Sequence, residues 1–440
     1  MARYKQFKLG VLLVASTFST LSYGAGFAIQ EQSVTGLGRA FAGSAAVAED
    51  ASTIFFNPAG LTYLESSELA VGLNFIKPRS DFQDSGSTFP FGSLAGNDGK
   101  DAGVEALVPN IYYAHKINDK AFAGIGINVP FGLATEYSDN WVGRYHAIKS
   151  DLKTININPA FAFKATEKLS LGFGVNLQYI DLELTQAVDV GTVCTVAGGA
   201  VAAACGAPAA NDGKAKLTAD DWSWGYNLGL IYQATEATRL AISYRSKVSH
   251  HLTGDGKWSI PTNAQPFQSA LGFIDGDISG DIALPESASF AIHHQINSKW
   301  AIMGDATWTR WERFEDLTIN SAINRLDTSK EENWENSMRY GIGVDYKHND
   351  KWTFRSGIAY DETPISDDYR TARIPGNDRK WISVGASYKM RDNITIDAGY
   401  THLFISDPKI DETDSNGYTL KGKYETSVDL LGVQVRWLLI

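Results

Sequence analysis

The sequence predicts an all-β membrane protein: a fourteen-stranded antiparallel transmembrane β-barrel with an N-terminal segment, here called the hatch, that plugs its lumen. Three observations support this fold class. From Glu68 onward, apolar residues alternate with polar or small ones, which is the period of a strand with one apolar face. The connections between these strands alternate between short and long, as is typical of bacterial outer-membrane barrels. An irregular but apolar segment precedes the first strand.

Residues 1–24 predict a cleaved secretory signal peptide. Three basic residues between Arg3 and Lys8 precede an apolar stretch, Leu9 to Phe18, and small residues stand before Ala25. The apolar stretch is too short to span a bilayer, and no later stretch approaches the roughly 18 apolar residues that a membrane helix needs. Removing three basic residues and no acidic one takes the formal net charge from −11 to −14. This negative charge argues against a nucleic-acid partner.

Residues 25–66 are composed like a linker but carry the apolar side chains of a core. The segment is rich in Gly, Ala and Ser, and it shows neither strand alternation nor a helical stripe. A barrel of fourteen strands is too wide for its own side chains to fill it, so its lumen is open to water or plugged. We therefore expect residues 25–66 to be the plug, because their apolar side chains need cover from water. These are Phe27, Ile29, Leu37, Phe41, Ile54, Phe55 and Phe56.

Residues 67–440 are predicted to form the barrel. In Leu169–Tyr179, for example, Leu, Phe, Val and Tyr alternate with Ser, Gly, Asn and Gln. A single strand of this kind also fits a soluble β protein, but the regular alternation of turn lengths favours the outer membrane of a Gram-negative bacterium. The fourteen expected strands are 67–80, 104–117, 120–132, 151–164, 168–184, 222–233, 238–252, 283–296, 299–314, 334–348, 351–362, 380–390, 394–405 and 425–440.

Aromatic residues are expected where the barrel wall meets the two membrane interfaces, because their rings are amphipathic. Trp300, Trp352 and Trp381 are expected to start strands just after the short turns, and Tyr346 and Tyr388 lie near strand ends. These positions predict interfacial girdles.

Several segments closely resemble those of one known family. They are AGFAIQEQSVTGLGRAFAGSAAVAEDAST, FFNPAG, VPFGLATEY, SYRSKV and KWTFRSGIAYDETPISDDYRTARIPGNDRKWISVGASY. Together they resemble the FadL family of outer-membrane transporters for hydrophobic molecules, from Ala25 to the C-terminus. The resemblance implies a monomeric barrel without cofactors that takes up long-chain fatty acids passively or, alternatively, uncharged aromatic or aliphatic hydrocarbons.

The same resemblance implies a route and a gate. Substrate is captured by extracellular loops, bound in the lumen and released sideways into the membrane, where the barrel contacts outer-membrane lipid and lipopolysaccharide. The tripeptide Asn57-Pro58-Ala59 matches a hatch motif that contacts a kink in the third strand, and locally it predicts a rigid turn. Pro130-Phe131-Gly132 interrupts the third strand, which predicts a bulge or gap, or simply the strand end. The resemblance implies that this segment borders the lateral opening.

Four polar residues are candidates for binding a substrate head group. A fatty acid carboxylate in a low-dielectric pocket needs a cation or several hydrogen-bond donors. Arg245, Arg339 and Arg355 lie on polar strand faces, where the alternative is an ion-paired residue that supports the hatch. Gln186 occupies the fifth-strand position at which the resemblance implies an arginine. A glutamine at this position is compatible with a fatty acid bound by neutral hydrogen-bond donors, and also with an uncharged hydrocarbon. The sequence therefore leaves both substrate classes open.

The long loops 185–221 and 253–282 correspond to an outer capture groove in the family. Phe267, Leu271 and Phe273 supply apolar surface that indicates either a binding site or internal packing. The i, i+4 spacing of the first two predicts a short helix. Cys194 and Cys205, close together in an exported chain, predict a disulfide rather than a metal site.

Two rival classes fit less well. A lipid hydrolase needs a nucleophile and a base held together, yet no spacing of Ser with His250, His251, His293 or His294 indicates a catalytic set. A general porin needs an open lumen, which the hatch opposes. We therefore predict a transporter that is not an enzyme and has no catalytic residues or metal ligands.

Overall fold

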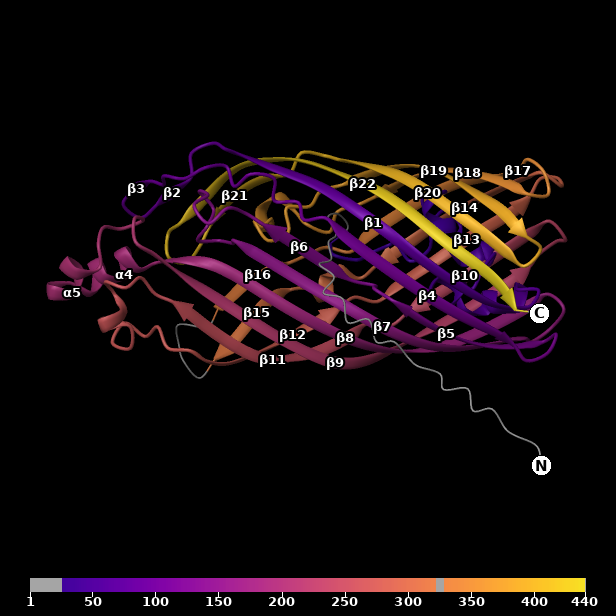
Figure 1. The fold of residues 1–440 in the computed structure, drawn as a ribbon, viewed down its shortest axis with the longest axis horizontal. Coiled ribbons are helices and arrows are strands. Elements are labelled where there is room, and N and C mark those ends of the chain that lie inside the picture. Colours follow the sequence, from indigo (N-terminus) through magenta and orange to yellow (C-terminus); the bar gives the residue numbers. More distant parts are fainter. Residues whose placement is uncertain (1–25, 322–327, 440) are drawn as a thin grey trace, which may run out of the picture.

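The computed structural model describes residues 26–321 and 328–439, so the predicted signal peptide lies outside the described residues. The long strands form one closed antiparallel barrel (Figure 1). β1 (Ser67–Asp84) pairs with β4 (Ala106–Lys116) on one side and with the last strand, β22 (Thr419–Leu439), on the other. This pairing closes the wall. No helix in the described ranges is long and apolar enough to cross a bilayer.

Fourteen wall strands can be followed around the barrel in the described residues, which confirms the predicted fold class. Several are interrupted and carry two labels. In order they are β1; β4; β5 (Ala121–Asn128) with β6 (Gly132–Glu136); β7 (Lys149–Lys164); β8 (Leu169–Asp189); β9 (Asp212–Gln233); β10 (Thr238–Arg245) with β11 (Val248–Ser259); β12 (Gly276–Leu284) with β13 (Ser287–Gln295); β14 (Trp300–Thr309) with β15 (Asp316–Ser321); β16 (Thr328–Glu331) with β17 (Ser337–Lys347); β18 (Trp352–Asp361); β19 (Arg379–Arg391); β20 (Ile394–Ile405); and β22.

The strands extend further on the long-loop side than the alternation predicts. β8 and β9 stay paired up to Asp189 and Asp212, well beyond the expected ends at 184 and 222. Lys214 and Lys216 lie in this extension, and neither face of a strand needs to be apolar once it leaves the membrane. Apolar alternation therefore marks the membrane-crossing part of each strand and not its full length. Loop strands β2 (Thr88–Phe89), β3 (Gly92–Ser93) and β21 (Lys409–Thr413) add to this end.

The outer wall is apolar with aromatic pairs near the short turns. Trp300 packs on Tyr346 across β14 and β17 with ring centroids 4.4 Å apart, and Trp352 packs on Tyr388 at 4.7 Å. Trp381 does not join them. It is buried, and the guanidinium of Arg339 lies 5.4 Å from its ring centroid. Trp381 follows a long loop, whereas Trp300 and Trp352 follow short turns. It therefore lies at the long-loop end of the barrel and not with the aromatic pairs at the short-turn end.

The hatch lies inside the barrel near the end that carries the short turns, drawn in indigo in Figure 1. It contains α1 (Val34–Leu37), α2 (Ser44–Val47), α3 (Thr53–Phe56) and the 3-10 helix η1 (Pro58–Tyr63). α1 contacts β19, β20 and β22, whereas η1 contacts β7, β8 and β9. Phe27, Leu37 and Ile54 have no exposed surface. The wall thus supplies the cover that the apolar residues of this segment require.

Candidate functional site

The third strand is broken by a one-residue bulge, here called the kink (residues 129–131). β5 ends at Asn128, paired with Asn156, and β6 resumes at Gly132, paired with Lys153. Between these two pairs the third strand advances by four residues, from 128 to 132, while β7 advances by only three, from 156 to 153. The one extra residue in the third strand defines a bulge. Thr154 fills the break: its Oγ1 accepts from the Phe131 N–H at 3.0 Å and donates to the Phe131 carbonyl at 2.7 Å.

On its other side the kink is paired with the hatch and not with the second strand. The ladder between β4 and β5 stops at Ile111 and Ile127. The N–H of Ile29 donates to the Pro130 carbonyl at 2.9 Å, and the N–H of Gly132 donates to the Phe27 carbonyl at 2.9 Å. Backbone polar groups of a barrel wall need partners, and here the hatch supplies them.

The backbone hydrogen bonds from the hatch to the kink come from Phe27–Ile29 and not from Asn57-Pro58-Ala59, the tripeptide for which the resemblance implies a contact with the kink. Asn57 instead donates to the carbonyls of Ala45 at 2.9 Å and Leu230 at 3.2 Å, and its Oδ1 accepts from the Ala59 N–H at 3.1 Å. Two wall glycines allow the tripeptide to lie this close to β8 and β9. A Cβ at Gly172 would lie 2.2 Å from the Ala59 nitrogen, and a Cβ at Gly229 would lie 1.9 Å from the Asn57 Oδ1.

A small inner cavity of about 100 Å³ lies between the hatch and the wall. Pro58, Pro130 and Phe131 all line it, so the hatch tripeptide and the kink share one space even though other residues pair with the kink. Pockets for drug-sized ligands run from roughly 300 to 1,000 Å³. The inner cavity in this conformation is therefore too small for a long-chain fatty acid.

The three candidate arginines lie in or near the lumen, and all contact the hatch. Arg339, in the wall of the inner cavity, pairs with Asp305 at 3.4 Å and donates to the Ala40 carbonyl. Arg355 pairs with Glu49 of the hatch at 2.8 Å. Both fit the alternative of ion-paired residues that support the hatch.

Arg245 differs from the other two because it has no ion pair within the described residues. Its Nη2 donates to the Phe55 carbonyl at 2.9 Å, and its guanidinium lies 4.2 Å from the centroid of the Phe55 ring. It also lines the inner cavity. Arg245 thus holds the hatch through neutral groups.

A larger outer cavity of about 470 Å³ lies among the long loops, where Gln186 is part of the wall. Its volume lies within the range of ligand pockets. Arg373, from the loop between β18 and β19, also lines it and donates to the Gln186 side chain at 2.7 Å. Sequence reasoning missed Arg373 because loop residues follow no strand period. Its apolar sequence neighbours, Ala372 and Ile374, are a weak signal that this part of the loop packs against the protein, and the structure buries both.

Two carboxyl groups of the outer cavity, those of Glu412 and Glu332, have pKa values shifted in opposite directions. Burial raises the pKa of Glu412, but His146 and Lys330 outweigh it and hold that pKa at about 2. The Lys330 Nζ lies 2.7 Å from the Glu412 carboxylate. Burial raises the pKa of Glu332 to about 8, and its main hydrogen bond comes from the indole of Trp334 at 3.0 Å. At neutral pH Glu412 is therefore charged and Glu332 is mainly neutral.

The stability of the loop around Glu332 is expected to depend on pH. The folded loop keeps a proton between pH 4.5 and about 8 that an unfolded loop would release, so its stability falls as the pH rises through this window. The positive charges of Lys330 and Arg373 lower the pKa of Glu332, and the negative charge of Glu412 raises it. Hydrogen exchange of residues 328–336, corrected for intrinsic rates, should show protection decreasing from pH 6 to pH 8. Glu332→Gln should flatten the profile; an unchanged pH slope in this variant would contradict the assignment.

The apolar loop residues, for which the sequence left a binding groove and internal packing as alternatives, pack against one another. Leu271 and Phe273 are buried in a cluster with Val190, Cys194 and Cys205. Phe267 is partly buried against this cluster. The predicted short helix is a 3-10 turn, η2 (Gln265–Phe267), followed by a bond from the Leu271 N–H to the Phe267 carbonyl at 2.9 Å. Internal packing therefore accounts for these residues.

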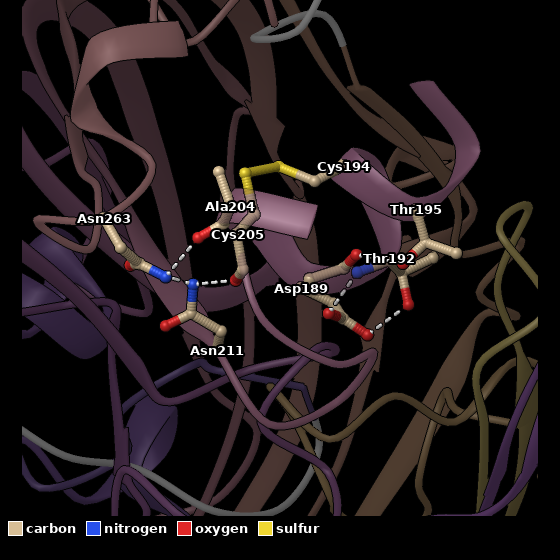
Figure 2. The surroundings of a disulfide bond; sticks show 9 residues. Asp189, Thr192, Cys194, Thr195, Ala204, Cys205, Asn211 and Asn263 are labelled. Atoms are coloured by element: carbon tan, nitrogen blue, oxygen red, sulfur yellow. Dashed lines mark hydrogen bonds between the residues drawn. A yellow bond between two sulfur atoms is a disulfide. The ribbon is translucent and has the colours of Figure 1, made fainter. Parts of the chain in front are cut away.

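Cys194 and Cys205 form a disulfide with their Cα atoms 6.0 Å apart (Figure 2). It joins α4 (Val190–Ala197) to α5 (Gly199–Ala204), the helices that project from the long-loop end in Figure 1. Asp189 caps α4 through the Thr192 N–H at 2.8 Å. On the other side of the bridge, Asn263 donates to the Ala204 carbonyl at 3.0 Å and so ties this hairpin to the next long loop.

Of the four histidines singled out in the sequence, only His294 has a hydroxyl partner among the described residues, the Thr238 Oγ1 at 2.9 Å from its Nδ1. His250 has Asp221 at 2.9 Å from Nδ1 and Gln178 at 3.1 Å from Nε2. His293 lies 3.3 Å from Arg239, and His251 pairs with Asp281 at 2.8 Å. A Ser–His–acid set needs a serine at the second ring nitrogen, and at His250 that place is taken by Gln178.

Comparisons with known proteins show the family to which this barrel belongs. Residues 15–438 match the family described as "Outer membrane protein transport protein (OMPP1/FadL/TodX)". A "Long-chain fatty acid transport protein" of Escherichia coli O6:H1 is 30% identical over 407 residues, covering 90% of each chain. A Pseudomonas aeruginosa FadL homologue has a TM-score of 0.86 at 24% identity, covering 94% of this chain and 99% of that chain. The Ralstonia pickettii toluene transporter TbuX has a TM-score of 0.65 at 21% identity, covering 94% of this chain and 99% of that chain. The chain therefore belongs to the OMPP1/FadL/TodX family of outer membrane transport proteins, whose members lie in the outer membrane of Gram-negative bacteria.

Proposed function

We propose that this protein takes up hydrophobic molecules passively across the outer membrane, with long-chain fatty acids as its main substrates. Substrate enters at the outer cavity, passes along the hatch and leaves sideways beside the kink, and the barrel works as a monomer surrounded by lipid and lipopolysaccharide. The observation that carries this proposal is the kink itself: its backbone is paired with the hatch and not with the neighbouring wall strand. A movement of the hatch there would uncover a gap that faces lipid.

Lateral release fits the physical chemistry of an apolar substrate. Transfer from water to an apolar environment is favourable by roughly 25 cal/mol per Å² of apolar surface, so exit into the bilayer avoids a cost that exit into the periplasm would carry. The filled lumen also opposes axial flow of ions or solutes. This arrangement favours a selective carrier over a general porin.

Uncharged aromatic or aliphatic hydrocarbons are the second candidate class. The inner cavity favours them, because Arg339 is neutralised there by Asp305 and Arg245 is occupied by the hatch. A head group that reached this cavity would have to compete for Arg245 with the Phe55 carbonyl and the Asn176 side chain. TbuX, which shares this fold, is a toluene transporter.

Uptake by a bacterial host that lacks its own carrier tests the proposal. We expect expression of the full chain to restore growth on oleate and cellular accumulation of labelled oleate. Rescue on toluene or an alkane alone would replace fatty acids by hydrocarbons as the substrate class. A folded, surface-inserted barrel that rescues neither class would refute the proposal.

A further inference from the structure

We propose that Arg373 binds the anionic head group of an amphiphilic substrate, a fatty acid carboxylate, in the outer cavity. This inference rests on the proposed function and names the residue that would distinguish an acid from a neutral hydrocarbon. Its basis is the placement of a cation that forms no ion pair with any described residue beside an apolar wall, in a cavity large enough for an alkyl chain.

The guanidinium of Arg373 is held in place by neutral groups. It donates to the Gln186 side chain at 2.7 Å, to the Ser150 hydroxyl at 3.1 Å and to the Lys149 carbonyl at 3.4 Å. A guanidinium has five N–H donors, so these bonds fix its orientation and leave donors for a ligand. A carboxylate can accept two of them in parallel, in the geometry that makes arginine the usual partner of this group.

Arg373 forms no ion pair with any described residue. Four carboxyl groups line the cavity, those of Glu331, Glu332, Glu412 and Asp414, and none of them lies within ion-pair distance of Arg373. The charge of Glu412 acts on Arg373 only from beyond that distance. Glu412 is taken by Lys330 at 2.7 Å and by His146 at 3.4 Å. Glu332 accepts from Trp334, and burial raises its pKa to about 8. A charge in such a partly desolvated place is stabilised by a bound counter-ion, which an anionic ligand would supply.

The wall next to this cation suits an alkyl chain. Leu217, Leu317 and Ile319 line the outer cavity and also a smaller apolar cavity beside it. The smaller cavity continues along Leu182 and Ile278. A ligand with its head at Arg373 can therefore lay its tail on a continuous apolar surface that leads away from the charge.

Binding of oleate and methyl oleate to the full chain in lipid nanodiscs tests the assignment, with empty nanodiscs as the blank. Methyl oleate keeps the alkyl chain and loses the charge. We expect Arg373→Gln to weaken oleate binding about tenfold or more, as loss of a charge-assisted hydrogen bond does, and to leave methyl oleate binding unchanged. Arg373→Lys should recover much of the oleate affinity. Arg310→Gln is the matched control, because Arg310 lies outside the cavity and pairs with Glu286 and Glu312.

Wild-type oleate affinity in Arg373→Gln would overturn the inference. Equal losses for oleate and methyl oleate would also overturn it, because they would show that Arg373 only holds Gln186 and Ser150 together. In both cases uptake of fatty acids by the wild-type chain would leave the proposed function standing. Wild-type protein that binds neither ligand would overturn the inference and the proposed function together. Heat-modified mobility in gel electrophoresis verifies that each variant is folded.

Discussion

Deletion of Pro130 is expected to reduce uptake at least tenfold, to the level of a host without the carrier, while the barrel still folds. The deletion leaves three steps between Asn128 and Gly132, which matches the three steps from Asn156 to Lys153 on β7. The third strand then has no extra residue and no proline, so its backbone can form a continuous ladder. Labelled oleate uptake measures the effect, and heat-modified mobility verifies the fold.

The alternation of faces supports this expectation. In the shortened strand Val129 would stand opposite Ile155, and Phe131 would stand opposite Thr154, the residue to which it is already bonded. The matched control is Pro130→Ala, which keeps the residue count and therefore the bulge, and should retain uptake. Wild-type uptake by a folded deletion variant would show that substrate does not leave beside the kink.

The barrel could be predicted from sequence because the membrane constrains every wall strand in the same way. Each crossing needs an apolar outer face, and each backbone group needs a partner, so alternation and turn length together define the fold. The same logic identified residues 25–66, whose apolar side chains require cover. Where the constraint ends, so does the prediction: β8 and β9 continue to Asp189 and Asp212 without the apolar alternation that marks their membrane parts.

The details of the site depend on contacts that have no period in the sequence. The kink was visible as Pro130 and Gly132, but its pairing with Phe27–Ile29 depends on the path of the hatch through the lumen. That path is set in part by Gly172 and Gly229, which allow Asn57-Pro58-Ala59 to lie close to β8 and β9. Arg373 was missed for the same reason. A loop residue becomes part of a site only when the fold brings it beside Gln186, far away in the chain.

Replacement of Glu49 by alanine is expected to loosen the hatch and raise ion conductance. Glu49 accepts from Arg39 within the hatch and from Arg355 of β18 at 2.8 Å. Arg39 also pairs with Asp345 of β17 at 3.2 Å. Both arginines are buried, so loss of Glu49 leaves two buried cations to share one carboxylate. Removing one partner of a buried ion pair costs about 3–5 kcal/mol, which is large against the stability of a short segment with three four-residue helices.

Planar-bilayer recordings measure this effect directly, because a seated hatch blocks the lumen and a displaced one does not. The wild-type chain should show low conductance, and Glu49→Ala should show larger, fluctuating currents. The recordings can be made in 1 M salt, because high ionic strength screens exposed charge pairs far more than this buried one. Glu236→Ala is the matched control: it removes the same side chain from an exposed turn between β9 and β10. Equal, low conductance in all three proteins would mean that the apolar contacts of the hatch, and not its ion pairs, keep it seated.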